Sequence, residues 1–199
     1  MPVLLKARGK CTTDHISQAG PWLRFRGHLD NISDNLFLGA NNAFTDQPGY
    51  GIDIESGETV QLPKLARSYK ERNIRWVAVG DENYGEGSSR EHAAMEPRHM
   101  AGTAIIARSF ARIAETNLKK QGVLPLTFAD PSDYEKVLVD DSIWLVNLTE
   151  LATGRPIAAV INHADGREDR IQLNHTLNDE QIEWFKAGSA LNVLRRLGG

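Results

Sequence analysis

The sequence contains one cysteine, Cys11, in 199 residues. A single cysteine excludes a disulfide within the chain, and it excludes an iron–sulfur or multi-cysteine metal site made by this chain alone. It is typical of a reducing compartment. No apolar run reaches membrane-spanning length and no secretory signal opens the chain, so we expect no membrane partner. The net charge of −3 is also too small to indicate a nucleic-acid surface.

The composition that remains is ordinary for a globular protein, with 41% hydrophobic and 25% charged residues. A chain of 199 residues is long enough to bury a substantial core. We expect residues 1–199 to form a single domain in which residues 1–10 are a linker or an edge strand. Short apolar runs alternate with helical patterns along the chain, which indicates α/β architecture.

Apolar runs predict buried strands, and the amphipathic segments between them predict helices. The predicted strands are residues 74–79, 103–107, 123–128, 143–146, 157–161 and 170–173. The predicted helices are residues 62–72, about 88–99, 110–120, 131–138 and 178–197. Asp165-Gly166 favours a hairpin turn between the last two strands. Trp22 and Phe25 are candidates for the core, Pro125 suggests an edge strand or a kink, and residues 45–57 look irregular.

Residues 80–92, GDENYGEGSSREH, are the most informative stretch, and we call them the central loop. They follow a predicted strand and lead into a predicted helix. Glycines allow backbone conformations that are closed to other residues, and the free N–H groups at a helix start attract anions. Ser88, Ser89 and Arg90 lie where those groups point. The pattern predicts a place where a carboxylate is held and a proton is removed beside it.

Three interpretations of the central loop compete on local chemistry. Ser88 and Glu91 have the spacing of a capping box, which would make the segment a simple helix start. A phosphate-binding loop is disfavoured, because neither a Gly-Lys-Ser/Thr ending nor dinucleotide-binding spacing is present. The third is a proton-transfer site with serine as base. A helix end stabilises an anion by about 0.3–1 kcal/mol, and one pKa unit is about 1.36 kcal/mol. Arg90 and exclusion of water would therefore have to supply most of the activation of the serine.

Two other segments carry polar chemistry. Residues 10–17 are rich in small polar side chains, which are typical of a helix cap or turn. Arg24 and Arg26 share a parity, so they are either a solvated face or, for one of them, a bidentate ligand of a carboxylate. The remaining candidates have helical spacing and are expected to pack and hydrogen-bond rather than bind a metal: His92, Met95 and His99.

Longer blocks of sequence resemble the C-terminal, swivelling domain of aconitase (aconitate hydratase) in its mitochondrial-type form. The blocks are residues 10–17 (KCTTDHIS), 20–22, 25–33 (FRGHLDNIS), 80–94, 96–99, 115–122 (ETNLKKQG), 181–185 and 187–192. The shorter motif GSSREHA also occurs in small subunits of isopropylmalate and homoaconitate dehydratases. The long flanking blocks are what favour aconitase.

The resemblance implies a role for several residues. Ser88 would be the base that abstracts the carbon-bound proton of the substrate. Arg26, Ser89 and Arg90 would bind the substrate, the arginines through its carboxylates. The further active-site positions would be Thr13, Asp14 and Ser17. The family interconverts citrate, cis-aconitate and isocitrate in the tricarboxylic acid cycle, with a [4Fe-4S] cluster that is bound by other domains.

The resemblance also implies a fold and partners. We expect a three-layer β/β/α domain around a mixed sheet or barrel, which is inactive alone and needs the cluster-bearing N-terminal aconitase domains, in the same chain or in a separate subunit. The expected location is the mitochondrial matrix, with the cytoplasm as the alternative. Cys11 is not one of the family's cluster ligands, and Ala114 stands where a histidine is usual. Two other functions stay open: the small subunit of a related 2-hydroxy-acid dehydratase, and a non-catalytic regulatory or binding module that retains the fold.

Overall fold

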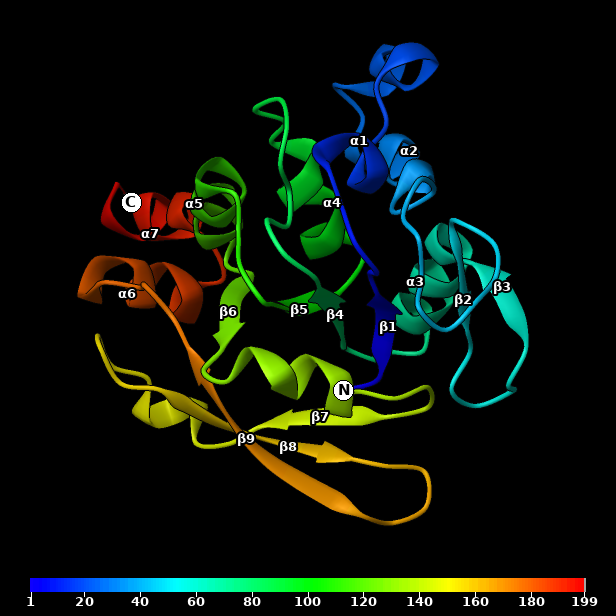
Figure 1. Ribbon diagram of the computed structural model, residues 1–199. Coiled ribbons are helices and arrows are strands. Elements are labelled where there is room, and N and C mark those ends of the chain that lie inside the picture. The colour runs from blue at the N-terminus through cyan, green and yellow to red at the C-terminus, as the bar shows by residue number, and fades with distance from the viewer. Residues whose placement is uncertain (199) are drawn as a thin grey trace.

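A mixed seven-stranded sheet forms the centre of the computed structural model, which describes residues 1–198 (Figure 1). Its strands are β1 (Val3–Lys6), β4 (Trp76–Gly80), β5 (Gly102–Ala107), β6 (Leu124–Phe128), β7 (Ser142–Leu145), β8 (Ile157–Asn162) and β9 (Glu168–Asn174). Their order across the sheet is β1-β4-β5-β6-β9-β8-β7. A separate antiparallel pair is made of β2 (Tyr50–Ile52) and β3 (Thr59–Gln61).

The helices are short and follow the strands along the chain. They are α1 (Thr13–Ile16), α2 (Leu29–Ile32), α3 (Leu62–Glu71), α4 (His92–His99), α5 (Arg112–Gln121), α6 (Asp179–Ala187) and α7 (Ala190–Leu197). Short segments of 3-10 helix are η1 (Gly20–Phe25), η2 (Ser33–Asn35), η3 (Pro131–Lys136) and η4 (Leu148–Glu150). Gly122 ends α5 in the left-handed conformation, with φ of 69°.

The main sheet closes on itself, because its two end strands meet. Strands β1, β4, β5 and β6 are parallel, whereas β9, β8 and β7 run antiparallel and fold over them. Pro2 pairs with Ser142, and the N–H of Ile143 donates to the carbonyl of Met1 at 2.8 Å. In Figure 1 the helices α4 and α5 lie above the parallel strands, α3 lies beside β1, and β7–β9 lie below. This confirms the expected β/β/α layers and the mixed sheet or barrel.

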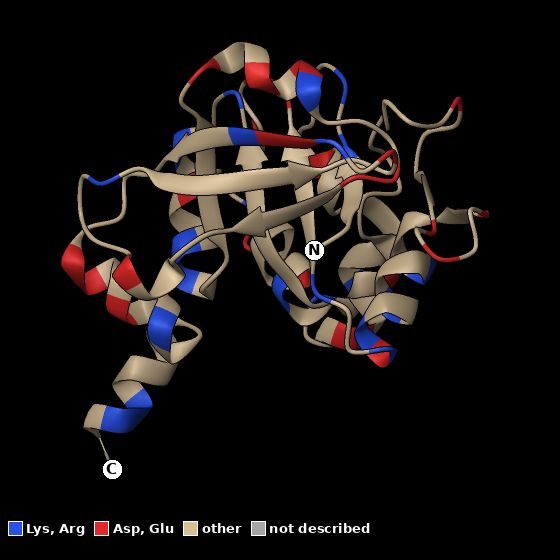
Figure 2. Cartoon of the chain, turned by 90° about the horizontal axis from the view of Figure 1, so that it is seen from below, with Lys and Arg blue, Asp and Glu red and all other residues tan. Residues whose placement is uncertain are grey.

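Each parallel strand contributes side chains to two cores. In β4, Val77 and Val79 face the interior of the barrel, while Trp76 and Ala78 pack under the helices. The Trp76 indole N–H donates to the carbonyl of Met100 at 2.7 Å, so this buried ring leaves no polar group unpaired. Strands β4, β5 and β6 contain no Lys, Arg, Asp or Glu, and charges gather on helices, loops and β9 (Figure 2). Burial from both sides explains why these strands read as continuous apolar runs.

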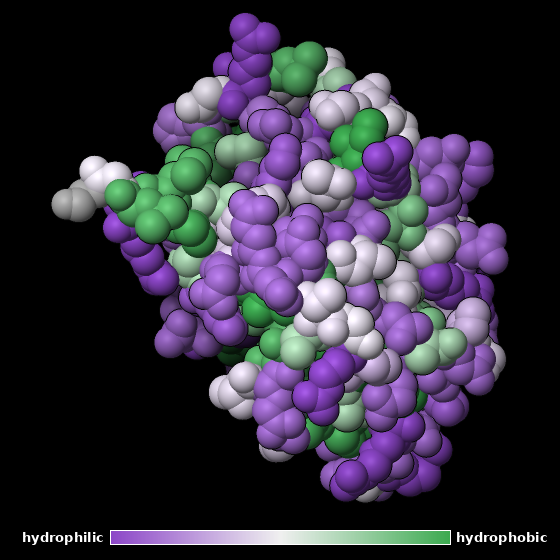
Figure 3. Space-filling view, turned by 90° about the vertical axis from the view of Figure 1, so that its left-hand side faces the viewer, coloured by the Kyte–Doolittle hydropathy of each residue, from purple (hydrophilic) through white to green (hydrophobic). Residues whose placement is uncertain are grey.

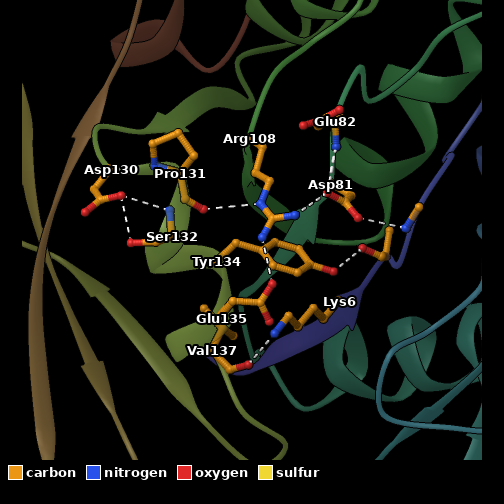
Figure 4. A network of polar contacts seen from close by, with 12 residues as sticks. Lys6, Asp81, Glu82, Arg108, Asp130, Pro131, Ser132, Tyr134, Glu135 and Val137 are labelled. Carbon is orange, nitrogen blue, oxygen red and sulfur yellow. Dashed lines mark hydrogen bonds and ion pairs between the residues drawn. The ribbon is translucent and has the colours of Figure 1, made fainter.

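A polar network closes one end of the barrel, at the carboxyl ends of the parallel strands (Figure 4). The ring of Tyr134 lies between the Lys6 ammonium, 4.3 Å from the ring centroid, and the Arg108 guanidinium, at 4.2 Å. Arg108 also forms ion pairs with Asp81 at 2.9 Å and Glu135 at 2.7 Å. Asp81 follows β4 directly, so the network fixes the base of the central loop.

The predicted strands are all present, and the hairpin turn at Asp165-Gly166 is confirmed between β8 and β9. The prediction of one helix over residues 178–197 is wrong. The chain breaks at Gly188, whose φ is 91°, and Ser189 starts α7 by accepting a hydrogen bond from the N–H of Asn192 at 3.1 Å. A Cβ on Gly122 would lie 2.2 Å from the carbonyl oxygen of Gly188, so the break seats this backbone against the end of α5.

Three smaller expectations also change. Trp22 and Phe25 are half-buried on η1, 6.3 Å apart, and pack on each other outside the core because this segment projects from the top of the domain in Figure 1. Strand β6 is interior rather than an edge, but β9 pairs only with its last two residues, so Pro125 has one neighbouring strand. Residues 45–57 contain β2.

Helix α7 leaves an apolar stripe on the surface of the domain (Figure 3). Leu191, Leu194 and Leu197 are 66%, 64% and 80% exposed. Within residues 1–198, no helix has the length and apolar character needed to cross a membrane.

Candidate active site

The central loop is anchored to the segment that carries α1. The N–H of Gly85 donates to the carbonyl of Cys11 at 2.7 Å, and the N–H of Thr13 donates to the carbonyl of Glu86 at 2.9 Å. Both contacts are between backbone groups, so they do not depend on side-chain identity. They bring residues 10–17 and the central loop, which are far apart in the sequence, into one structural unit.

A second anchor holds the loop to the turn between β5 and α5. The N–H of Tyr84 donates to the carbonyl of Ser109 at 2.9 Å, and the carbonyl of Tyr84 accepts from the N–H of Ala111 at 3.0 Å. The Tyr84 ring is buried edge-on against Phe110, 5.8 Å between centroids. The loop is therefore fixed from two sides, which is the kind of support that a positioned reactive group requires.

Gly85 makes the close approach of the loop to α5 possible. Its φ is +80°, and a Cβ at this position would lie 2.3 Å from the Cβ of Ala114. Any larger residue would both strain the backbone and displace α5. Ala114, the residue at which the chain departs from the family pattern, thus forms the wall against which the loop rests.

Ser88, Arg90 and Thr13 line one small cavity between the loop, α1 and α5. Its remaining walls are mainly apolar: Ile16, Ala93, Ala94, Ile113, Ala114 and Leu118. The Thr13 hydroxyl is buried and has no hydrogen-bond partner within residues 1–198. An apolar floor below the Ser88 hydroxyl and the Arg90 guanidinium limits water beneath a bound anion, which strengthens the electrostatic interactions above it.

Arg90 is held in place by α1. Its Nη1 donates to Asp14 Oδ1 at 2.8 Å and to the carbonyl of Ser17, and the side chain is only 14% exposed. The hydrogen bond from Arg90 lowers the pKa of Asp14, so this carboxylate stays ionised. All side-chain hydrogen bonds that Arg90 forms within the described residues start from Nη1. Nε and Nη2 thus remain available for a bidentate contact with a carboxylate.

The structure places Arg26 and Ser89 beside this cluster rather than in it. Arg26 ends η1 with an exposed side chain, and its carbonyl contacts His92 Nε2 at 2.9 Å, which ties η1 to α4. Ser89 lines a groove on the α5 side of the loop together with Arg112 and Lys120. Of the residues singled out from sequence, the structure gathers Thr13, Asp14, Ser17, Ser88 and Arg90 in one place.

The capping-box interpretation of Ser88 and Glu91 is wrong. Helix α4 begins at His92, with Glu91 as its N-cap and no side-chain hydrogen bond there. Ser88 therefore lies before the first helical turn, on the exposed part of the loop. Its hydroxyl is not committed to the helix end.

Sequence reasoning missed Glu96, a fully buried acid on α4. The Ser17 hydroxyl donates to Glu96 Oε1 at 2.7 Å. Burial raises the pKa of Glu96 from 4.5 to about 8, against the lowering effects of the Ser17 hydrogen bond and the Arg90 charge. One signal was available, because Glu96 lies among the residues Ala93, Ala94 and Pro97, which form the inward side of the helix.

The raised pKa of Glu96 predicts a pH-dependent stability. Because the folded state holds the proton more tightly than the unfolded chain, the stabilising contribution is complete below pH 4.5 and is lost as the pH rises through about 8. At about 1.36 kcal/mol per pKa unit, the loss is at most about 5 kcal/mol. We expect Glu96→Gln to remove this loss, so that denaturant unfolding gives a variant more stable than wild type at pH 8.5 and similar to it at pH 5. The exposed Glu58→Gln variant is the control; identical profiles for wild type and Glu96→Gln would contradict the assignment.

The residues of this chain do not fit an iron–sulfur cluster. Cys11 is buried, and burial raises the pKa of its thiol to about 12, far from the thiolate that ligates iron. Between residues 1 and 198, no group of three or more His, Cys, Asp or Glu side chains is arranged to hold a metal ion.

Comparison with known proteins places these features in a family. Residues 1–131 match the family of the aconitase C-terminal domain. The chain is 59% identical over 195 residues to the mitochondrial aconitate hydratase of Gracilaria gracilis and 55% identical over 195 residues to that of Saccharomyces cerevisiae. Each match covers 98% of this chain and 25% of the relative, so the chain spans about a quarter of the length of these curated relatives.

Among solved structures, the chain is similar to a 3-isopropylmalate dehydratase of Methanocaldococcus jannaschii. The TM-score is 0.53 and the sequence identity 20%, and the match covers 94% of this chain and 87% of the other. The likeness supports the fold.

Proposed function

Because the chain belongs to the aconitase C-terminal domain family, we propose that it is the C-terminal part of an aconitate hydratase, a lyase. Together with the remaining domains it would interconvert citrate and isocitrate through cis-aconitate. The observation that carries this proposal is the convergence of Thr13, Ser88 and Arg90 from two distant segments onto one cavity, where Asp14 holds the Arg90 guanidinium. A base beside an anchored guanidinium suits proton abstraction next to a carboxylate.

The substrate would be held chiefly by arginines. Arg90 would bind one carboxylate through Nε and Nη2, while Asp14 and the Ser17 carbonyl keep its guanidinium oriented. Arg26 and Ser89 flank the cluster and would bind the substrate from the η1 and α5 sides. A tricarboxylate has enough charge to engage both arginines at once.

Ser88 would take the carbon-bound proton. A serine hydroxyl is a weak base. Proton abstraction by Ser88 would therefore depend on the positive charge of Arg90 and on the apolar residues that line the cavity. Thr13, whose buried hydroxyl faces no protein partner among the described residues, is a second oxygen at the same cavity.

The rest of the active site would come from elsewhere. Since these residues do not fit a cluster, we propose that a [4Fe-4S] cluster is bound by the remaining domains, in the same polypeptide or in a separate subunit. The exposed leucines of α7 suit a chain that belongs to a larger assembly. The relatives are named mitochondrial, and we propose the mitochondrial matrix for this chain, with the cytoplasm as the alternative.

The test is reconstitution. The purified chain alone is expected to show no conversion of citrate or isocitrate to cis-aconitate, and turnover is expected once it is combined with the cluster-bearing domains of a relative. Absorbance of cis-aconitate measures the rate. Full turnover by the chain alone would contradict a shared active site. Turnover of isopropylmalate but not of citrate would favour a related dehydratase, and no tricarboxylate binding by calorimetry would favour a non-catalytic module.

A further inference from the structure

We propose that Glu96 is a positioning residue that fixes Arg90 for carboxylate binding, acting through Ser17. This inference rests on the proposed function, because it requires that Arg90 binds a substrate carboxylate. Glu96 itself has no part in the chemistry proposed above. Glu96 and Ser17 are both 0% exposed, so neither can contact the substrate directly.

The contacts form a continuous chain from α4 to the cavity. Ser17, the C-cap of α1, donates its hydroxyl to Glu96 Oε1 at 2.7 Å across 79 residues of sequence. The carbonyl of the same Ser17 accepts from Arg90 Nη1. Glu96 therefore locks the residue whose backbone oxygen orients the guanidinium.

Fixing the guanidinium before the substrate arrives improves binding. An arginine side chain loses considerable rotamer freedom when it is ordered, and a preorganised side chain has already lost it. Arg90 is not part of a helix, so its orientation depends on Asp14 and on the Ser17 carbonyl. Loosening Ser17 should weaken carboxylate binding more than it affects the proton-transfer step.

The protonation state of Glu96 decides whether it supports carboxylate binding by Arg90 or competes with the carboxylate for the charge of Arg90. As a neutral acid, Glu96 accepts the hydrogen bond from Ser17 and does not compete for Arg90, which can pair with Asp14 and with the substrate carboxylate. As an anion it would become a second negative charge near Arg90. Burial keeps its pKa near 8, so the neutral form is present at pH 7.

The charged groups on the elements packed against α4 fall into two sets, those in ion pairs and those without one. Arg90 faces Glu96 from the central loop, with Asp14 behind it on α1. On α2, Asp30 pairs with Arg67 and His99. On α5, Glu115 pairs with Lys119, whereas Arg112 and Lys120 line the groove beside Ser89 and form no ion pair within residues 1–198. Strand β5 contains no titratable side chain. Arg90 is the charge to which an ionised Glu96 would respond.

The test uses the reconstituted enzyme with citrate. Glu96→Ala is expected to raise KM about tenfold and to change kcat less than twofold, while Glu96→Gln, which still accepts from Ser17, restores KM. In wild type, KM should rise with pH through about 8, and in Glu96→Gln it should not. Asp133→Asn, a buried acid paired with Lys136 away from the cavity, is the matched control and should leave KM unchanged.

A second measurement does not depend on turnover. In the isolated chain, the side-chain NMR signals of Arg90 should be sharp in wild type and Glu96→Gln and broadened in Glu96→Ala. If Glu96→Ala does not fold, Ser17→Ala, which removes only the hydroxyl, must show the same broadening and the same rise in KM. Suppose that KM and the Arg90 signals are unchanged in these variants while Arg90→Lys still raises KM. That result would reject the positioning role of Glu96 and leave the proposed function standing. An Arg90→Lys variant with wild-type KM would instead reject the proposed function.

Discussion

Replacing Ser88 by alanine is expected to lower kcat of the reconstituted enzyme about 10³-fold, within the range of general acid–base catalysis. The change removes only an exposed hydroxyl, and the loop is held by backbone hydrogen bonds at Tyr84, Gly85 and Thr13. The fold should therefore persist, with a melting temperature close to that of wild type. The measurements are kcat for citrate and thermal unfolding followed by circular dichroism.

The control for this variant is Ser56→Ala, an exposed loop serine between β2 and β3. It should retain the wild-type rate. Retained turnover in Ser88→Ala would reject Ser88 as the base and would leave the loop as an anion site only.

Replacing Arg90 by lysine is expected to raise KM for citrate about 100-fold, which is about 2.8 kcal/mol at about 1.4 kcal/mol per tenfold. Lysine keeps the charge but is a point donor, so it cannot bind a carboxylate with two parallel hydrogen bonds while also holding Asp14 and the Ser17 carbonyl. Steady-state kinetics separate the rise in KM from any change in kcat.

Arg67→Lys provides the matched comparison. Arg67 lies on α3 and pairs with Asp30 at 2.9 Å and with Asp34 at 2.8 Å. The Arg67→Lys variant therefore also loses the two-pronged contact of a guanidinium with carboxylates, but at a site outside the cavity. We expect no change in its KM. Similar kinetics for Arg67→Lys and Arg90→Lys would contradict a direct contact between Arg90 and the substrate.

Much of the fold was predictable from sequence because the parallel strands are buried on both faces. Such strands appear as uninterrupted apolar runs, and β4 and β5 are the clearest cases. The glycine after α5 also marks its end correctly, since Gly122 adopts a left-handed conformation that few other residues tolerate. Both features depend only on neighbouring residues in the sequence, so they can be predicted without knowledge of the fold.

The errors arise where distant contacts decide the structure. The break at Gly188 depends on its approach to Gly122, and no periodicity within residues 178–197 reveals it. Glu96 likewise has its partner Ser17 79 residues away. An acid beside Pro97 looks like a surface residue until the fold shows that this side of α4 faces α1.

The candidate site was found by motif, but its arrangement was not. The sequence groups Ser88, Ser89 and Arg90 as neighbours, whereas the structure turns Ser88 and Arg90 toward α1 and Ser89 toward the groove beside α5. Loop conformation sets these directions, and it depends on the positive φ of Gly85 and Gly87 rather than on the order of the side chains. The catalytic roles themselves stay predictions.

The junction between the two end strands of the barrel has a consequence for how the chain folds. The contacts of Met1 and Pro2 with Ser142 and Ile143 join residues about 140 positions apart, which is the kind of long-range pairing that slows folding. During synthesis β1 is made before its two neighbours in the closed sheet, β4 and β7, so it must wait for each of them. In that interval its free edge can pair with another chain, so early chaperone protection of these residues would limit aggregation.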